Sequence, residues 1–135
     1  MPVVDASFTA ALFNEGDASH TAAARWYNVA RLGPERFSAP TLILPEIASA
    51  LGRTQGQPAR AAAALAVLRD RRFITLAAVT PALAELAAEL AYRHGLRGCD
   101  AIYVALAQEL GQTLVTFDRE QAARASSVVV TVIPS

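Results

Sequence analysis

Four acidic side chains stand at points in the sequence where regular structure is expected to begin or end. Asp5 and Asp118 each follow a short apolar segment, whereas Glu46 and Asp100 each stand near the start of an expected helix. Mg²⁺ and Mn²⁺ prefer oxygen ligands and usually keep several waters, so a few carboxylates and a substrate phosphate suit them well. These residue types therefore favour a divalent-cation site.

The positions of the four acids predict that they converge. In open parallel sheets the carboxyl ends of the strands form the ligand crevice, and Asp5 and Asp118 both come where a strand is expected to end. Glu46 and Asp100 can reach the same edge from the first turns of their helices. Four carboxylates in one pocket raise one another's pKa values and oppose ionisation, and a divalent cation removes that conflict.

Each acid also has an ordinary structural explanation. Asp5 and Asp100 could cap helices, Glu46 could complement a helix dipole, and Asp118 could form an Asx turn. Taken one at a time, these structural roles are the more common ones. The joint placement of all four at one expected edge favours the functional interpretation.

Helical and strand patterns alternate along the chain with short connections, which is typical of an α/β fold with a mainly parallel sheet. The expected strands are Val3–Val4, Phe73–Leu76, Thr113–Phe117 and Val128–Ile133. The expected helices are Ser7–Phe13, a longer one from Asp17 or Ser19 to Leu32, Ala59–Arg69, Pro81–His94 and Asp100–Leu110, with a helical turn over Arg119–Ala125. Proline and glycine stand near several of these boundaries, where helices usually start and stop.

Pro40 and Pro45 bracket an apolar segment that leads into a helix over Glu46 to Leu51, with Gly52 as its expected stop. The sequence leaves the start of this helix open. If it begins at Pro40, then Pro45 lies inside it and should kink it, because the proline ring clashes with the carbonyl four residues back. The question bears on function because Pro45 directly precedes Glu46.

Length and composition limit the class of protein. The chain has 135 residues, of which 53% are hydrophobic, and this fits a single domain over residues 1–135. No apolar run is long enough to span a membrane and no basic N-terminal segment precedes one, so a cytoplasmic protein is expected. Cys99 is the only cysteine, which leaves no internal disulfide and no cysteine frame for zinc. Twelve basic and twelve acidic residues cancel, so net charge alone does not indicate a nucleic-acid binder.

All of the basic residues are arginine and none is lysine. This argues against receiver domains and acidic-pocket phosphatases, which also place aspartates at strand ends but typically need a pocket lysine. The sequence has no G-x-G-x-x-G or Walker A motif for a nucleotide and no G-x-S-x-G motif for a serine hydrolase. Arg97 and Arg119 lie close to Asp100 and Asp118 and are candidates for steering phosphate, although an exposed surface arginine is the more common case.

Four ordered segments resemble the motifs of PIN-domain proteins. They are Val3-Val4-Asp5-Ala6-Ser7, Leu42-Ile43-Leu44-Pro45-Glu46-Ile47-Ala48, Cys99-Asp100-Ala101-Ile102-Tyr103-Val104-Ala105-Leu106-Ala107 and Leu114-Val115-Thr116-Phe117-Asp118. The resemblance spans essentially the whole chain and is greatest to the VapC-type toxins of bacterial and archaeal toxin–antitoxin pairs. Pro45 departs from the common family pattern, in which a helix former precedes the glutamate.

The resemblance implies a PIN-like three-layer α/β/α fold with a central, mainly parallel five-stranded sheet. It implies a Mg²⁺-dependent endoribonuclease, with Mn²⁺ as the alternative metal. Asp5, Asp100 and Asp118 would bind the metal, and Glu46 would bind it or orient the attacking water. It also implies an RNA substrate, a homodimer and a small cognate antitoxin that covers the active-site groove.

Ser7 and Thr116 match small hydroxyl positions beside the family's acids. Capping and strand packing explain these two residues as well as a role in holding carboxylates or waters does. His20 and His94 are expected in the end turns of helices and are given no catalytic role. Two alternatives stay open, a non-catalytic PIN-like binding or scaffold module and a stand-alone PIN nuclease with no antitoxin. The presence of all four acids argues against the first.

Overall fold

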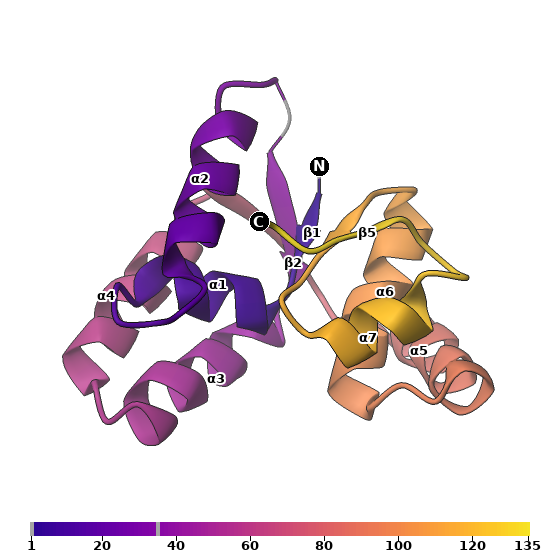
Figure 1. The fold of residues 1–135 in the computed structure, drawn as a ribbon. Coiled ribbons are helices and arrows are strands. Elements are labelled where there is room, and N and C mark those ends of the chain that lie inside the picture. The colour runs from indigo at the N-terminus through magenta and orange to yellow at the C-terminus, as the bar shows by residue number, and fades with distance from the viewer. Residues whose placement is uncertain (1, 35) are drawn as a thin grey trace.

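A computed structural model describes residues 2–34 and 36–135 (Figure 1). Its five strands form one parallel sheet in the order β3-β2-β1-β4-β5. The strands are β1 (Val3–Val4), β2 (Phe37–Pro40), β3 (Ile74–Ala77), β4 (Leu114–Val115) and β5 (Thr131–Val132). The α/β fold with a central, parallel five-stranded sheet is therefore confirmed.

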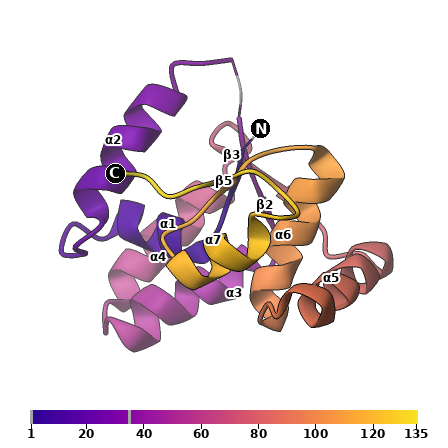
Figure 2. The same ribbon diagram turned by 45° about the vertical axis from the view of Figure 1, so that its right-hand side comes forward.

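Helices cover both faces of the sheet. They are α1 (Ala6–Phe13), α2 (His20–Ala30), α3 (Ile43–Ile47), the π-helix η1 (Ala48–Thr54), α4 (Pro58–Leu68), α5 (Pro81–His94), α6 (Gly98–Leu110) and α7 (Arg119–Ala125). Helices α1 to α4 gather on one side and α5 and α6 on the other (Figures 1 and 2). Helix α7 lies in front of α6 in Figure 1 and between the two groups in Figure 2. Within the described ranges, no helix is both long and apolar enough to cross a membrane.

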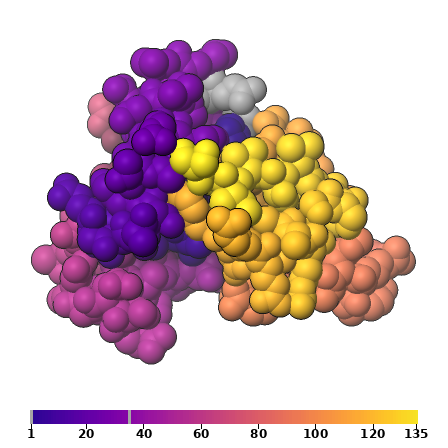
Figure 3. Space-filling model, viewed as in Figure 1, coloured from indigo at the N-terminus to yellow at the C-terminus, as the bar shows by residue number. Residues whose placement is uncertain are grey.

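The C-terminal segment after β5 extends to helix α2 in the N-terminal half of the chain. After β5 it runs beside α2, where Arg25 Nη1 donates to the main-chain oxygen of Ser135 at 3.2 Å. In the space-filling view these last residues, in yellow, lie directly against the purple atoms of α2 (Figure 3). The C-terminal segment therefore packs against α2.

The register of β1 and β4 determines where the site forms. Val4 pairs with Val115 in this parallel ladder, so the next residue on each strand, Asp5 and Thr116, leaves the sheet at the same edge. Both valines are buried, as expected for central strands of a parallel sheet covered on both faces. Helix α6 packs against this part of the sheet, and its buried alanines, such as Ala101 and Ala105, allow a close approach. The first turn of α6 is thereby held at the same edge.

Strand β2 was not predicted from the sequence, and β4 and β5 are shorter than the predicted Thr113–Phe117 and Val128–Ile133. Segment Phe37–Pro40 is a buried strand that the pattern did not predict, because four residues without polar alternation and with a terminal proline carry little strand signal. Pro40 is tolerated because it is the last residue of the strand. The final strand is shorter than the predicted Val128–Ile133, since the backbone N–H groups of Val128 and Val129 instead bond the carbonyl of Ala125 at the end of α7.

The helix around Glu46 begins at Ile43, between the two starts that the sequence left open. Pro45 thus lies in the first turn, where a backbone N–H would have no partner within the helix, and the missing donor costs little. The expected stop at Gly52 is wrong. The chain continues through Gly52 as the π-helix η1 to Thr54, and this π-helix begins at Ala48, two residues after Glu46.

Candidate active site

One pocket at the carboxyl edge of the sheet collects all four acidic residues singled out in the sequence. Its lining is Asp5, Ala6, Ser7, Glu46, Arg97, Asp100, Tyr103, Asp118 and Gln121, around a volume of about 120 Å³. The acids arrive from four places in the fold: the β1–α1 junction, α3, the first turn of α6 and the β4–α7 junction. Four carboxylates therefore face a single guanidinium, and the pocket is strongly acidic.

Asp5 is the most deeply held of the four acids, with a residue exposure of 4%. It is the N-cap of α1, because its Oδ1 accepts the backbone N–H of Phe8 at 3.0 Å. The same oxygen accepts the Ser7 hydroxyl at 2.7 Å, and Oδ2 accepts the Thr116 hydroxyl at 2.5 Å. Asp5 can therefore cap α1 and also bind a cation, because Oδ2 still has a free lone pair.

Burial raises the pKa of Asp5 from 3.8 to about 6. Loss of water around the carboxylate is the largest cause, and the hydrogen bonds from Phe8, Thr116 and Ser7 oppose it. The nearby charge of Asp100 adds a smaller upward contribution. A buried carboxylate of this kind gains from any cation that approaches its remaining lone pairs.

Glu46 is held by a hydroxyl from the opposite layer of helices. The hydroxyl of Tyr103 on α6 donates to Glu46 Oε1 at 2.6 Å. The Tyr103 side chain is buried, and burial together with the Glu46 carboxylate raises its pKa far above the ordinary range, so it remains a donor. This bond sets the direction in which Glu46 enters the pocket.

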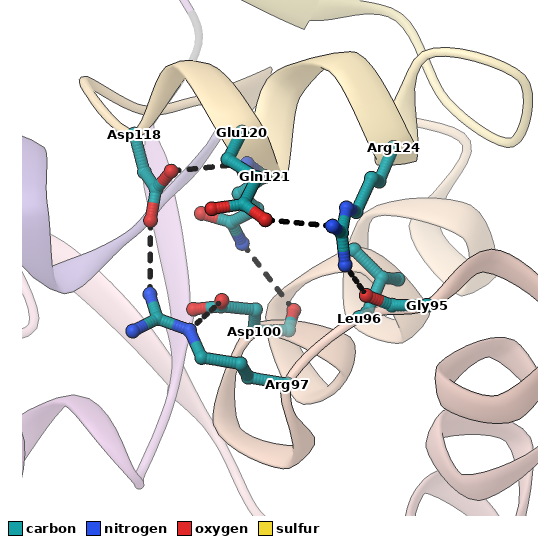
Figure 4. Close-up of a pocket in the computed structure, with 8 residues that line it drawn as sticks. All are labelled: Gly95, Leu96, Arg97, Asp100, Asp118, Glu120, Gln121 and Arg124. Carbon is teal, nitrogen blue, oxygen red and sulfur yellow. Dashed lines mark hydrogen bonds and ion pairs between the residues drawn. The ribbon is translucent and has the colours of Figure 1, made fainter.

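Asp100 and Asp118 are joined by an arginine. Arg97 Nε donates to Asp100 Oδ2 at 2.8 Å, and Arg97 Nη2 donates to Asp118 Oδ2 at 2.9 Å (Figure 4). The other oxygen of Asp118 caps α7 by accepting the backbone N–H of Gln121 at 3.0 Å. Asp100 caps no helix, because it lies in the first turn of α6 rather than before it.

A second pocket adjoins the first and shares Arg97, Asp100, Asp118 and Gln121 with it. Its far side is formed by the loop after α5 and by Arg124, whose guanidinium bonds the carbonyl of Gly95 and pairs with Glu120 at 2.7 Å (Figure 4). The acidic pocket thus adjoins a second pocket that is lined by residues of α7.

Comparison with known proteins places the chain in a family. The model of the PIN domain matches residues 3–126. The chain belongs to the PIN-domain family. Among solved structures, VapC20 from Mycobacterium tuberculosis, described as a sarcin–ricin loop cleaving toxin, is 30% identical with a TM-score of 0.82, over 99% of this chain and 100% of that one. The family resemblance seen in the four motifs is confirmed.

Other structural relatives of this PIN domain are more distant in sequence and show the fold. A toxin–antitoxin complex from Klebsiella pneumoniae aligns with a TM-score of 0.72 at 19% identity, over 100% of this chain and 98% of that one. VapBC2 from Rickettsia felis, bound to a promoter DNA fragment, aligns with a TM-score of 0.71 at 13% identity, over 99% and 98% of the two chains. No curated protein matches the chain.

The donor set of this PIN domain fits a hard divalent cation, because its pocket offers carboxylate oxygens and neither sulfur nor imidazole. Within the described residues, however, no three acidic, histidine or cysteine side chains stand close enough to hold an ion as they are placed. Hydrogen bonds account for the spacing of the acids. The Arg97 guanidinium lies between Asp100 and Asp118, and the Tyr103 hydroxyl binds Glu46. The residues around the pocket fit a divalent cation by the chemistry of their oxygens and by their location at one edge of the sheet.

Two polar residues that line the pocket, Tyr103 and Gln121, were not predicted from the sequence. Tyr103 stands three residues after Asp100, a spacing that places both on one helix face, so this signal was available. Gln121 carried no signal, because its place depends on the tertiary position of α7. Arg119 is exposed and does not line the pocket. His20 bonds the carbonyl of Ala11 through Nδ1 at 2.9 Å, away from the acids.

Proposed function

We propose that this PIN domain is a metal-dependent endoribonuclease and the toxin of a VapBC-type toxin–antitoxin pair that acts on RNA in the cytoplasm. The observation that carries the proposal is the convergence of Asp5, Glu46, Asp100 and Asp118 on one pocket. The 30% identity to VapC20 over nearly the whole chain supports RNA as the substrate, because that relative is described as cleaving an RNA loop.

Asp5, Asp100 and Asp118 would hold Mg²⁺ or Mn²⁺ in this scheme, directly or through water. The bound ion supplies an activated water and stabilises charge on the phosphate. Glu46 would ligate the ion or orient the attacking water, since its second oxygen is free of the Tyr103 hydroxyl. The protein's own contribution would be to present these oxygens on one side of a bound phosphodiester.

Ser7 and Thr116 would act on the carboxylates rather than on RNA. Each donates its hydroxyl to one oxygen of Asp5 and accepts a backbone N–H from the β4–α7 connection: Ser7 from Phe117 at 2.9 Å and Thr116 from Asp118 at 3.0 Å. The two hydroxyls therefore tie the orientation of Asp5 to that of the segment that carries Asp118. Such support of metal ligands typically matters for both affinity and rate.

An antitoxin segment would lie in the groove beside Glu46. That groove is lined mainly by small and apolar residues of α1, α3 and η1, and it shares Ser7 and Glu46 with the acidic pocket. A peptide seated there would cover the entrance of RNA to the carboxylates. Exposed apolar side chains elsewhere, Val29 and Leu32 near the end of α2 and Tyr92 on α5, are available to a homodimer.

The experiment that tests the activity is cleavage of RNA by purified protein in Mg²⁺, in Mn²⁺ and in EDTA. The substrates are a pool of structured RNAs and a hairpin with the sarcin–ricin loop. Asp5→Asn and Asp100→Asn are compared with Glu109→Gln, a substitution of an exposed carboxylate on the same helix as Asp100. All four proteins are prepared identically, so that contaminating nuclease appears equally in each.

We expect cutting that needs metal, is lost in both aspartate variants and is kept in Glu109→Gln. Equal activity of all four proteins over a broad range of RNAs would point instead to a non-catalytic PIN-like module. A short reading frame for a DNA-binding protein beside the gene, whose product stops the cutting when added, would separate the toxin from a stand-alone nuclease.

A further inference from the structure

Arg97 occupies a position in the acidic pocket that a cation is expected to take. Its guanidinium lies between Asp100 and Asp118, which come from α6 and from the start of α7, and it bonds one oxygen of each (Figure 4). Two carboxylates brought this close repel one another unless a positive charge separates them. Arg97 supplies that charge from within the chain.

The location of Arg97 in its own helix does not explain this arrangement. Arg97 is the N-cap of α6, and its side chain makes no capping hydrogen bond. A cation at a helix N-terminus is disfavoured, because the backbone N–H groups there carry partial positive charge. Electrostatic attraction to the carboxylates of Asp100 and Asp118 therefore holds the guanidinium in this position.

The oxygen that Arg97 takes from Asp118 is the one a metal would need. Asp118 Oδ1 already accepts the backbone N–H of Gln121 and caps α7, so Oδ2 is the oxygen that points into the pocket. The guanidinium of Arg97 also holds Asp100 Oδ2. A divalent ion bound by both Asp100 and Asp118 would need these same oxygen atoms. The ion therefore competes with the Arg97 guanidinium for them.

We propose that Arg97 is a resident counter-charge, which neutralises Asp100 and Asp118 in the metal-free site and must leave before a divalent cation can bind there. The inference rests on the proposed metal-dependent function. It makes Arg97 a positioning residue whose ion pairs set the metal affinity. The affinity for the ion is then lower than the carboxylates alone would give, and the metal-free protein is protected from repulsion among its acids.

The departure of Arg97 is physically easy. Its side chain is 76% exposed, whereas those of Asp100 and Asp118 are 18% and 27% exposed. A displaced guanidinium therefore returns to water without opening the core, and the aspartates stay in place. Exposed ion pairs are individually weak, so a doubly charged ion with good oxygen ligands can replace them.

The test is the affinity of the full chain for MnCl₂ without RNA, measured by isothermal titration calorimetry on wild type, Arg97→Gln and Arg119→Gln. Arg119 is the matched control, because it is exposed, next to Asp118 in sequence and outside the pocket lining. We expect Arg97→Gln to bind Mn²⁺ about tenfold more tightly, as removal of two weak ion pairs implies. Arg119→Gln should stay within about twofold of wild type, as expected for a screened surface charge.

A second readout follows the arginine itself. In ¹⁵N NMR of the wild type, the Arg97 Nε–H resonance should move toward that of a free guanidinium as MgCl₂ is added, while the resonance of Arg119 stays. Equal Mn²⁺ affinity of wild type and Arg97→Gln would overturn the proposal and leave the metal site intact. An equal gain in Mn²⁺ affinity in Arg97→Gln and Arg119→Gln would also overturn the proposal, since it would reflect only the change in net charge. Failure of every variant to bind Mn²⁺ would remove the metal-dependent function as well.

Discussion

The hydroxyl of Thr116 lies 2.5 Å from Oδ2 of Asp5, although 111 residues separate the two in the chain. The contact is a direct consequence of strand register, because each residue follows one member of the Val4–Val115 pair. Thr116 Oγ1 also accepts the backbone N–H of Asp118 at 3.0 Å. One hydroxyl group thus connects two of the four acids.

Thr116→Val is expected to destabilise the protein by about 1 to 2 kcal/mol, since it keeps the shape but leaves the Asp118 N–H and an oxygen of Asp5 without their partner. Because the Thr116 hydrogen bond lowers the pKa of Asp5, its loss should also raise that pKa above about 6. Urea denaturation measures the first effect, and NMR titration of the Asp5 carboxyl in EDTA measures the second. Thr75→Val, at an exposed position on β3, serves as the control. An unchanged Asp5 pKa in Thr116→Val would refute this account of the site.

Asp5→Asn should stabilise the metal-free protein at neutral pH. The folded state holds a proton on Asp5 up to about pH 6, whereas the unfolded chain releases it near pH 4, so the folded state binds more protons in this window. Stability from this group is therefore highest below about pH 4 and is lost as the pH rises through about 6. The difference between the pKa values of the folded and unfolded states corresponds to roughly 3 kcal/mol at most.

The asparagine substitution can keep the hydrogen bonds around position 5. Its oxygen can accept from Ser7 and Phe8, and its amide can donate to Thr116, whose own proton can turn toward Gln121 Oε1 at 3.1 Å. Denaturation of wild type and variant in EDTA, from pH 4 to 8, measures the difference, with Glu109→Gln as the control. A stability difference that does not change with pH would contradict the raised pKa.

Tyr103→Phe is expected to lower kcat for RNA cleavage about tenfold while KM changes little. The substitution removes only the hydroxyl that directs Glu46, and the ring remains packed in the core. Stability should fall by about 1.5 to 3 kcal/mol, as for other hydrogen bonds to a charged group. Tyr92→Phe is the matched control, because Tyr92 is 75% exposed. A variant that cleaves RNA at the wild-type rate would show that Glu46 needs no such support.

The sequence predicted those parts of the site that local patterns encode. Asp5 and Asp118 follow apolar strand residues, and parallel strands end at a shared edge, so the convergence of the two acids could be inferred from the order of residues alone. The β2 strand was missed because Phe37–Pro40 has neither alternation nor length. Tertiary pairing with β1 and β3 makes it a strand despite its weak local preference.

The links among the acids lay beyond sequence reasoning. Arg97 was recognised as a candidate for steering phosphate, but its bond to Asp118 joins residues 21 positions apart on two different elements. The widening of the helix after Glu46 into η1 was also unforeseen, because π-helices are rare and Gly52 gave a stronger signal for a stop. Both features depend on how α6, α7 and α3 pack rather than on the residues within each.

Mg²⁺ or Mn²⁺ should raise the melting temperature of the protein, because an ion that binds only the folded state stabilises it by mass action. At a concentration about 100 times the dissociation constant, the gain is about 2.7 kcal/mol, or a shift on the order of 5 to 10 °C for a chain of this size. Asp100→Asn should reduce the shift, whereas Glu109→Gln on the same helix should retain it. Differential scanning fluorimetry over a metal titration, at constant ionic strength, measures all three proteins.

The melting experiment can separate loss of metal binding from loss of stability in the metal-free protein. Asp100→Asn removes a proposed metal ligand and also one partner of Arg97. The metal-free variant should still melt within a few degrees of wild type, since an exposed ion pair contributes little. The difference between the proteins should then appear only when metal is added. A metal-induced shift of equal size in wild type and Asp100→Asn would mean that the ion binds elsewhere on the chain. In that case the four acids would have to be explained by their helix caps, their ion pairs with Arg97 and the hydrogen bond between Tyr103 and Glu46 alone.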